Sequence, residues 1–398
     1  MMITNHNWEV ISVSKPVIWQ RDTHETWLLN PPREYIVCAD QIGAIEQFVI
    51  SRADLSSTAK YHPFHMGENI AGKRLLIERY RDRGIGDMLF LTGPMNYIQH
   101  VYGRGVHIDM YGLSERSQIL GSHPALAHKA VLAGPLLYSD LDLYAAHWFI
   151  GSVTEYSSMA DQPNVYDALY KQIGIDPAMV DPKYKRPTVS LTEEDDRALD
   201  SMFYYIWGER KIDLRIQPYY VVAPTAHSSM RCMPYQTWID LIKELAAIRP
   251  VIVLGHDHGG RMPSAGMDFA SFNRALSEIG GGVVNLMGDT GIRNVMSLIS
   301  KAKVAVTLDS GLLYVAQALR TPAISIWGTH APESRLGYDK SYMELAIANK
   351  ACPATPCYAY AEFPIDKCLR GASQRVCENL SSVTVDQVVE KVKQAEAQ

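Results

Sequence analysis

The amino-acid sequence predicts an α/β protein with two Rossmann-like domains and a small β-rich extension at the N-terminus. The first indication is length, because a chain of 398 residues is too long for one ordinary core and suits two domains of roughly 150 residues each. The second is a long series in which short apolar strands alternate with helices, which is typical of parallel βαβ units. The third is a basic, proline-bounded stretch, residues 181–187, with the composition of a linker.

These observations divide the chain into four segments. Residues 1–70 carry β-like runs separated by prolines and polar turns, and we expect them to form the extension. Residues 71–185 form the first Rossmann-like domain. Residues 186–215 form the linker and a helix, and residues 216–398 form the second Rossmann-like domain.

Local patterns indicate the individual elements. Alternation of apolar and polar residues predicts the strands of the extension, and continuous apolar runs predict buried strands further on. Capping boxes that begin at Thr192 and Thr384 mark two helix starts. The expected strands are 8–13, 34–37, 48–51, 74–78, 106–110, 129–132, 147–150, 219–223, 251–254, 283–286, 304–308 and 323–327. The expected helices begin at 87, 192 and 385 or span 235–248, 292–302 and 312–319.

Composition excludes several classes of protein. Hydrophobic residues make up 47% of the chain and charged residues 20%, as in a globular protein. The net charge of -5 argues against a surface that binds nucleic acid throughout. No run approaches the ~18 apolar residues that span a bilayer, and residues 1–16 lack the apolar core of a signal peptide. We therefore expect a cytoplasmic protein with reduced thiols.

Four of the six cysteines lie close together near the C-terminus. Their spacing is C-x4-C-x10-C-x8-C, which is looser than the paired C-x2-C motifs of zinc ribbons. We favour buried, reduced thiols here, with a structural zinc site as the alternative. The four are Cys352, Cys357, Cys368 and Cys377.

The first candidate site follows the strand at 74–78. Gly84 and Gly86 permit a tight turn, and Asp87 falls at the start of the next helix. A carboxylate there is stabilised by the helix dipole and could act as a general base. The alternative is a helix cap without catalytic function. The two glycines alone are weak evidence for a nucleotide, because the third glycine of a Rossmann motif is missing.

The second candidate site is the turn Asp309-Ser310-Gly311, between a predicted strand and the helix that begins near Leu312. Ligands of open parallel sheets bind where strands end and helices begin. The backbone N–H groups of Ser310, Gly311 and Leu312 suit a diphosphate, and Asp309 could accept hydrogen bonds from sugar hydroxyls. The alternative is a well-capped helix without a ligand.

The third candidate site is the loop after the strand at 219–223. It contains Thr225, Ser228 and Arg231. Arg231 could supply a cation to an anionic leaving group. The alternative is an exposed arginine on a mobile loop.

In order and spacing, the three segments resemble the lipopolysaccharide heptosyltransferase family of GT-B-fold glycosyltransferases. Residues 86–94 match a G-D-x-L-x-x-T-x-P pattern, and residues 231–238 match K-x-W-P-x-x-x-W with Arg231 for Lys and Met233 for the first Trp. Residues 309–322 match D-[ST]-G-x-x-H-x-A-x-A-L-x-x-P with Tyr314 for His, and a Gly-Thr turn follows at 328–329. The resemblance covers roughly residues 73–395 and includes the C-terminal cysteine region.

The resemblance implies a fold and a reaction. The two Rossmann-like domains would face each other across a cleft, with 71–185 binding the acceptor and 216–398 binding a nucleotide-diphosphate sugar as co-substrate. Sugar transfer would proceed with inversion, without a cofactor or a required metal. Asp87 would be the base, Arg231 would hold the diphosphate, and Asp309 with its neighbours would bind the donor sugar and phosphates. The full donor set is Thr225, Ser228, Arg231, Gly255, Asp309, Ser310, Gly311, Leu312 and Tyr314, and the acceptor set is Arg81, Arg83 and Gly86.

Three functions remain open at this point. The first is synthesis of a surface glycan such as a lipopolysaccharide core, with a glycan or glycolipid acceptor. The second keeps the chemistry but uses a hydroxymethylated pyrimidine in DNA. Arg79, Arg81 and Arg83 could contact the backbone phosphates of DNA, or equally the phosphates of a lipid-linked core sugar. The third is a catalytically inactive GT-B binding module, which the presence of both Asp87 and Asp309 argues against.

Overall fold

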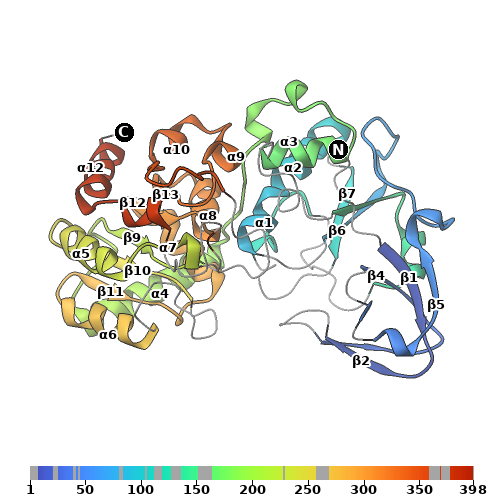
Figure 1. Cartoon of the computed structure of the whole chain (residues 1–398), viewed down its shortest axis with the longest axis horizontal. Helices are drawn as coiled ribbons and strands as arrows, with labels where there is room; N and C mark the ends of the chain where they lie inside the picture. The colour runs from blue at the N-terminus through green and yellow to red at the C-terminus, as the bar shows by residue number, and fades with distance from the viewer. Residues whose placement is uncertain are drawn as a thin grey trace. The chain divides into compact units, whose positions relative to one another are not determined.

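The computed structural model describes residues 8–20, 26–38, 42–43, 45–79, 84–103, 105–111, 119–126, 136–150, 164–226, 229–256, 269–357, 368 and 377–397. The chain divides into two compact units (Figure 1). The first contains the described residues up to Gly84, those from Phe90 to Ile150, and Val165–Lys185. The second contains Ile85–Leu89, Asn164 and the chain from Arg186 onward.

The first unit begins with antiparallel β-structure. Strand β1 (Trp8–Val13) lies between β4 (Glu34–Cys38) and β5 (Val49–Asp54), and β2 (Val17–Gln20) pairs with β3 (Thr26–Leu29). Trp8 and Val10 pack in one core cluster, whereas Ile11 and Val13 pack in another. Since successive side chains of a strand point to opposite faces, both faces of β1 are buried. The predicted N-terminal β-rich region is present.

The same unit continues as an α/β layer. Strand β6 (Arg74–Arg79) pairs in parallel with β7 (His107–Tyr111) on one side and β8 (Ala146–Ile150) on the other. Leu76 of β6 belongs to the same core cluster as Trp8 and Val10, so the β-rich region shares a core with this layer. The strand expected at 129–132 falls outside the described residues. The helices of this unit are α2 (Thr92–Tyr102) and α3 (Val165–Gln172), whereas α1 (Ile85–Phe90) belongs to the second unit except for its last residue.

The second unit is built on a six-stranded parallel sheet in the order β11-β10-β9-β12-β13-β14. The chain runs from β9 outward through β10 to β11, then returns to β12 beside β9 and continues outward on the other side. The point between β9 and β12 is therefore a topological switch point, where open α/β sheets bind their ligands. The strands are β9 (Tyr220–Ala223), β10 (Val251–Val253), β11 (Val283–Asn285), β12 (Val304–Leu308), β13 (Ala323–Ile326) and β14 (Ala346–Ile347).

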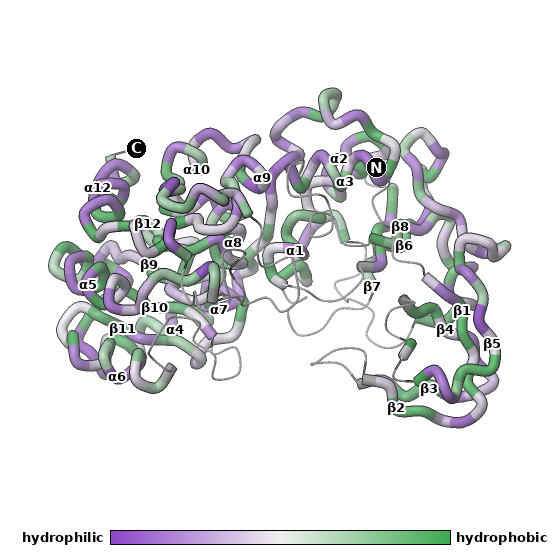
Figure 2. The backbone as a smooth tube through the Cα atoms, in the orientation of Figure 1, coloured by the Kyte–Doolittle hydropathy of each residue, from purple (hydrophilic) through white to green (hydrophobic). Residues whose placement is uncertain are grey.

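Amphipathic helices cover this sheet. In Figure 2, α5 shows green and purple segments along its length, as expected where one face packs on a sheet. Both predicted capping boxes are present, since Thr192 caps α4 and Thr384 caps α12. None of the described helices is long and apolar enough to cross a membrane. The helices are α4 (Glu193–Arg210), α5 (Tyr235–Ala246), α6 (Phe269–Ile279), α7 (Ile292–Lys301), α8 (Gly311–Leu319), α9 (Glu333–Leu336), α10 (Lys340–Glu344), α11 (Glu378–Ser381) and α12 (Val385–Glu396).

Candidate functional site

The turn between β12 and α8 lies at the switch point of the six-stranded sheet. All five residues of β12 are buried, and its last residue, Leu308, leads directly into Asp309. Ser310 is the N-cap residue of α8, but its side chain makes no capping hydrogen bond. The Asp309 N–H donates to the Ile326 carbonyl at 3.2 Å, which fixes the turn to the end of β13. The exposed backbone N–H groups of a helix N-terminus favour an anion at this position.

Asp309 is the centre of a buried hydrogen-bond network, and it is only 4% exposed. Its Oδ1 accepts a hydrogen bond from the Tyr314 hydroxyl at 2.6 Å, and its Oδ2 lies 2.6 Å from Nδ1 of His330. Arg231 reaches the same residue from the loop after β9. Its Nη1 donates to the Asp309 main-chain carbonyl at 3.0 Å and lies 4.0 Å from Oδ2.

Burial and charge set the protonation states of this network. Burial alone would raise the pKa of Asp309, but His330 and the charges of Arg231 and Arg335 hold that pKa below its usual range. Burial lowers the pKa of His330 to about 4, although Asp309 opposes this shift. At neutral pH the network therefore contains an ionised Asp309 and a neutral His330 that donates its Nδ1–H to the carboxylate.

Two buried hydroxyl groups flank this network. Ser310 Oγ follows Asp309 in the chain, and Thr329 Oγ1 precedes His330. Within the described part of the chain, neither oxygen has a hydrogen-bond partner. A buried polar group without a partner is costly, so both oxygens are candidates for contact with a polar ligand.

Thr225 and Gly255 meet beside the ends of β9 and β10. A side chain at Gly255 would place its Cβ 2.7 Å from the Thr225 hydroxyl oxygen, so only glycine fits there without displacing Thr225. Thr225 is itself buried. These two predicted donor residues therefore lie in contact.

The helix that carries Asp87 contacts the N-terminus of α8. Residues Ile85–Leu89 cluster with the second unit. A Cβ at Gly86 would lie 2.6 Å from Cδ2 of Tyr314, and a Cβ at Gly311 would lie 2.8 Å from Cβ of Ile85. Both glycines are required by this close packing. Asp87 itself is half-buried in the first turn of α1.

Several predicted residues are grouped in this site, and others fall outside the description. Arg231, Asp309, Ser310 and Tyr314 are joined by contacts or by chain adjacency, with Gly311 and the partly exposed Leu312 in the first turn of α8. The predicted residues Arg81, Arg83 and Ser228 lie outside the described residues. Three residues were missed by the sequence analysis, although the Gly-Thr turn pointed to their segment: Thr329, His330 and Arg335.

Two of the C-terminal cysteines lie against the loop that carries His330: a Cβ at Gly328 would be 3.3 Å from Cys377 Sγ, and the Cys357 N–H donates to the Thr329 carbonyl at 3.0 Å. Cys377 and Cys352 are buried, and Cys357 and Cys368 are half-buried. Burial raises the pKa of the Cys377 thiol, with smaller contributions from Cys357 and Cys352. No group of three or more metal-binding side chains is arranged around a metal position among the described residues.

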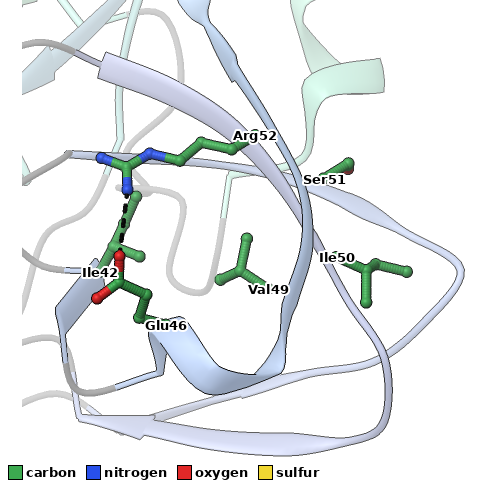
Figure 3. Close-up of a pocket in the computed structure, with 6 residues that line it drawn as sticks. All are labelled: Ile42, Glu46, Val49, Ile50, Ser51 and Arg52. Carbon is green, nitrogen blue, oxygen red and sulfur yellow. Dashed lines mark ion pairs between the residues drawn. The ribbon is translucent and has the colours of Figure 1, made fainter.

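The first unit contains a shallow hollow of its own. It has a volume of about 220 Å³ and is lined by Ile42, Glu46, Val49, Ile50, Ser51 and Arg52 (Figure 3). Arg52 Nη1 lies 3.7 Å from Glu46 Oε1 at its edge. None of the predicted binding or catalytic residues that the structure describes lines this hollow.

Comparison with known proteins identifies relatives of the fold. Residues 167–360 match the sequence model of glycosyltransferase family 9 (heptosyltransferase). The ADP-heptose lipopolysaccharide heptosyltransferase II of E. coli superposes with a TM-score of 0.54 at 16% identity, over 82% of this chain and 99% of that one. The family 9 glycosyltransferase of Veillonella parvula gives 0.57 at 10% identity, over 83% and 99%.

A third solved structure matches almost the whole chain. It is TibC, an iron-containing dodecameric glycosyltransferase from enterotoxigenic E. coli, with a TM-score of 0.57 at 13% identity over 99% of this chain and 92% of that one. No curated protein matches by sequence. The family match and the shared fold confirm the resemblance that the motifs predicted.

Proposed function

We propose that this chain, of which residues 167–360 match glycosyltransferase family 9 (heptosyltransferase), moves a sugar from a nucleotide-diphosphate sugar to an acceptor hydroxyl with inversion at the anomeric carbon. One observation carries the proposal. At the switch point of the six-stranded sheet, a helix N-terminus and Arg231 come together at Asp309, beside the Ser310 hydroxyl, which has no hydrogen-bond partner among the described residues. This combination suits a ligand with both a diphosphate and hydroxyl groups.

The donor diphosphate lies at the N-terminus of α8. The backbone N–H groups of Ser310, Gly311 and Leu312 and the guanidinium of Arg231 supply donors and positive charge there. Thr225 and Gly255 border the same side of the sheet and bind the remainder of the nucleotide. The protein itself supplies the positive charge that compensates the diphosphate, so we propose that transfer requires no metal.

Asp87 is the proposed base. Its carboxylate takes the proton of the acceptor hydroxyl as the acceptor oxygen forms a bond to the anomeric carbon. The bond between that carbon and the diphosphate oxygen breaks on the opposite face, and the nucleoside diphosphate leaves with the electron pair. Gly86, the neighbour of Asp87, packs against Tyr314, and this contact supports the assignment.

The donor to test first is ADP-heptose. TibC was solved in complex with ADP-D-β-D-heptose, and the family match is to heptosyltransferases. The proposed acceptor is a hydroxyl of a surface glycan such as a lipopolysaccharide core. None of the relatives described above is a DNA-modifying enzyme, and no described contact favours a DNA acceptor.

A thermal-shift screen of nucleotide sugars tests the donor. A donor held ~100-fold above its Kd should stabilise the protein by about 2.7 kcal/mol, and the absence of any stabilising nucleotide sugar would remove the proposal.

A single substitution tests the base. Asp87→Asn should abolish transfer while donor binding stays within about twofold. Asp386→Asn is the matched control, because Asp386 is an exposed aspartate in the first turn of α12; it should leave transfer unchanged. Unchanged turnover in Asp87→Asn would exclude Asp87 from the mechanism, and loss of turnover in EDTA would overturn metal independence.

A further inference from the structure

Both oxygens of the Asp309 carboxylate are already engaged by the protein. Tyr314 donates to Oδ1 and His330 donates to Oδ2, each at 2.6 Å. Short hydrogen bonds to an ionised acceptor are strong, and the side chain is almost fully buried. We call Tyr314, Asp309 and His330 the Asp309 clamp. Its carboxylate joins the end of β12 to the first turns of α8 and to the loop after β13.

The loop that carries His330 is fixed from its other side. The Asn379 side chain donates to the Gly328 carbonyl at 3.0 Å, and the Cys357 N–H donates to the Thr329 carbonyl at 3.0 Å. A Cβ at Gly328 would lie 2.8 Å from the Leu380 side chain, so the loop packs tightly on α11. The imidazole of His330 is therefore held in one orientation.

That orientation determines what His330 can bind. A neutral imidazole that donates through Nδ1 has an acceptor at Nε2 and no second proton to give. The oxygens of a diphosphate are also acceptors, so they do not match Nε2. A sugar hydroxyl does match, because its proton can be donated to Nε2 while its oxygen accepts from another group.

The neighbouring hydroxyls fit the same ligand. Thr329 precedes His330 in the chain, and Ser310 follows Asp309. Each hydroxyl oxygen, Thr329 Oγ1 and Ser310 Oγ, therefore belongs to the neighbour of one partner in the His330–Asp309 hydrogen bond. Both are at least nine-tenths buried and lack a hydrogen-bond partner among the described residues. Hydroxyl groups donate and accept, so a polyhydroxylated sugar can satisfy both of them.

We propose that His330 contacts the donor sugar, accepting a hydrogen bond from a sugar hydroxyl through Nε2, with Asp309 as its anchor and Tyr314 as a positioning residue. This assignment rests on the proposed function and changes one expectation. Asp309 was expected to accept hydrogen bonds from the sugar, whereas here its main role is to hold His330 and Tyr314. The residues that recognise the sugar are then His330, Ser310 and Thr329.

The test compares two ligands that differ only in the sugar. The affinities of ADP-heptose and ADP are measured by calorimetry for the wild type and for His330→Asn. The asparagine amide can still donate to Asp309 near the position of Nδ1, but it has no atom at the position of Nε2. We expect the Kd of ADP-heptose to rise about tenfold, the loss of roughly one hydrogen bond, while the Kd of ADP stays within about twofold.

Two further variants distinguish the loss of a contact with the sugar from a general disturbance of the fold. His330→Gln places an amide oxygen near the position of Nε2 and should retain more ADP-heptose affinity than His330→Asn. Tyr314→Phe removes only the hydroxyl donor and should raise KM for the donor more than it lowers kcat. Equal loss of ADP and ADP-heptose in His330→Asn, or no loss of either, would overturn the assignment. If the wild-type protein binds ADP but no nucleotide sugar, the proposed function itself fails.

Discussion

Nδ1 of His330 lies 2.6 Å from Oδ2 of Asp309, and both side chains are buried. An asparagine at position 309 would present its amide NH2 to either His330 or Tyr314, each of which donates to the carboxylate. One donor would then face another donor, and the positive charges of Arg231 and Arg335 would lose a compensating anion. We expect Asp309→Asn to lower the free energy of unfolding by about 2–4 kcal/mol.

Urea unfolding at pH 7 measures this change, and Asp386→Asn serves again as the exposed control. A loss below about 0.5 kcal/mol in Asp309→Asn would show that the clamp does not contribute to stability. Asp309→Asn should also lose sugar transfer from the donor, since residue 309 can then no longer accept hydrogen bonds from both His330 and Tyr314.

Close packing predicts a second effect, at Gly86. A methyl group there would lie 2.6 Å from Cδ2 of Tyr314, and the ring cannot move without disturbing its hydrogen bond to Asp309. Displacements of this size at a binding site can cost up to about 100-fold in rate. We expect Gly86→Ala to reduce donor turnover by at least about tenfold.

Gly208 offers the matched control. It lies inside α4, and a Cβ there meets no atom of the described residues within 4 Å. Gly208→Ala should leave turnover unchanged and raise the free energy of unfolding by roughly 0.5–1 kcal/mol, because alanine favours helix formation more than glycine. Wild-type turnover in Gly86→Ala would mean that the contact with Tyr314 is dispensable.

Local patterns in the sequence predicted much of the fold. The capping boxes at Thr192 and Thr384 depend on residues three positions apart, and the strands of the second unit are continuous apolar runs; both signals are contained in short windows. Helix α6 was missed, although Phe272, Leu276 and Ile279 stand at helical spacing.

Long-range relationships could not be predicted in the same way. Asp309 and Arg231 were singled out because each follows a strand, but their pairing depends on β9 and β12 being neighbours in the sheet. His330 follows β13 and comes to Asp309 only because β13 pairs with β12. The burial of both faces of β1 likewise depends on a long-range contact, because one face shares a core with Leu76. No pattern within residues 1–70 indicates that contact.

A third prediction concerns the ion pair between α4 and α7. Arg293 donates through Nε to Asp195 Oδ1 at 2.9 Å and through Nη2 to Oδ2. Burial opposes ionisation of Asp195, but the hydrogen bonds from Arg293 and Thr192 hold its pKa at about 2. We expect Arg293→Met to lower the free energy of unfolding by about 2–3 kcal/mol, since it leaves a largely buried carboxylate without its cationic partner.

A double-mutant cycle isolates this interaction. The coupling energy between Arg293→Met and Asp195→Asn should be about 1–2 kcal/mol. The same two helices supply the control pair, Lys301 and Asp196, whose charged atoms are 3.6 Å apart and whose side chains are both more than half exposed. That pair should show a coupling of about 0–1 kcal/mol, and equal coupling in both cycles would contradict the role of burial.

The last prediction is a loss of stability in mild acid. Burial lowers the pKa values of His123 and His330 to about 4 and also lowers that of His147. Their hydrogen bonds agree with neutral rings, since Nδ1 of His123 accepts from the Ala125 N–H at 3.2 Å and Nδ1 of His147 accepts from the His62 N–H at 3.0 Å.

These depressed values fix the sign of the pH dependence. Between pH 6.5 and about 4, the unfolded chain binds protons at these histidines while the folded protein does not. Their contribution to stability is therefore complete above pH 6.5 and is lost as the pH falls toward 4. The contribution of Asp195, whose pKa is held at about 2, is present above pH ~4 and is lost only as the pH falls from there toward 2, so the two effects are separable.

Urea unfolding at pH 7, 6 and 5 measures the histidine effect, and a substitution assigns part of it. His123→Asn places an amide oxygen where Nδ1 accepts from Ala125, but it cannot titrate, so the decrease in unfolding free energy from pH 7 to pH 5 should be smaller by on the order of 1–2 kcal/mol. His65→Asn alters an exposed histidine and should leave the decrease as in the wild type. If all three proteins lose the same free energy, His123 does not remain neutral in the folded state, because a ring that charges equally in both states contributes no slope.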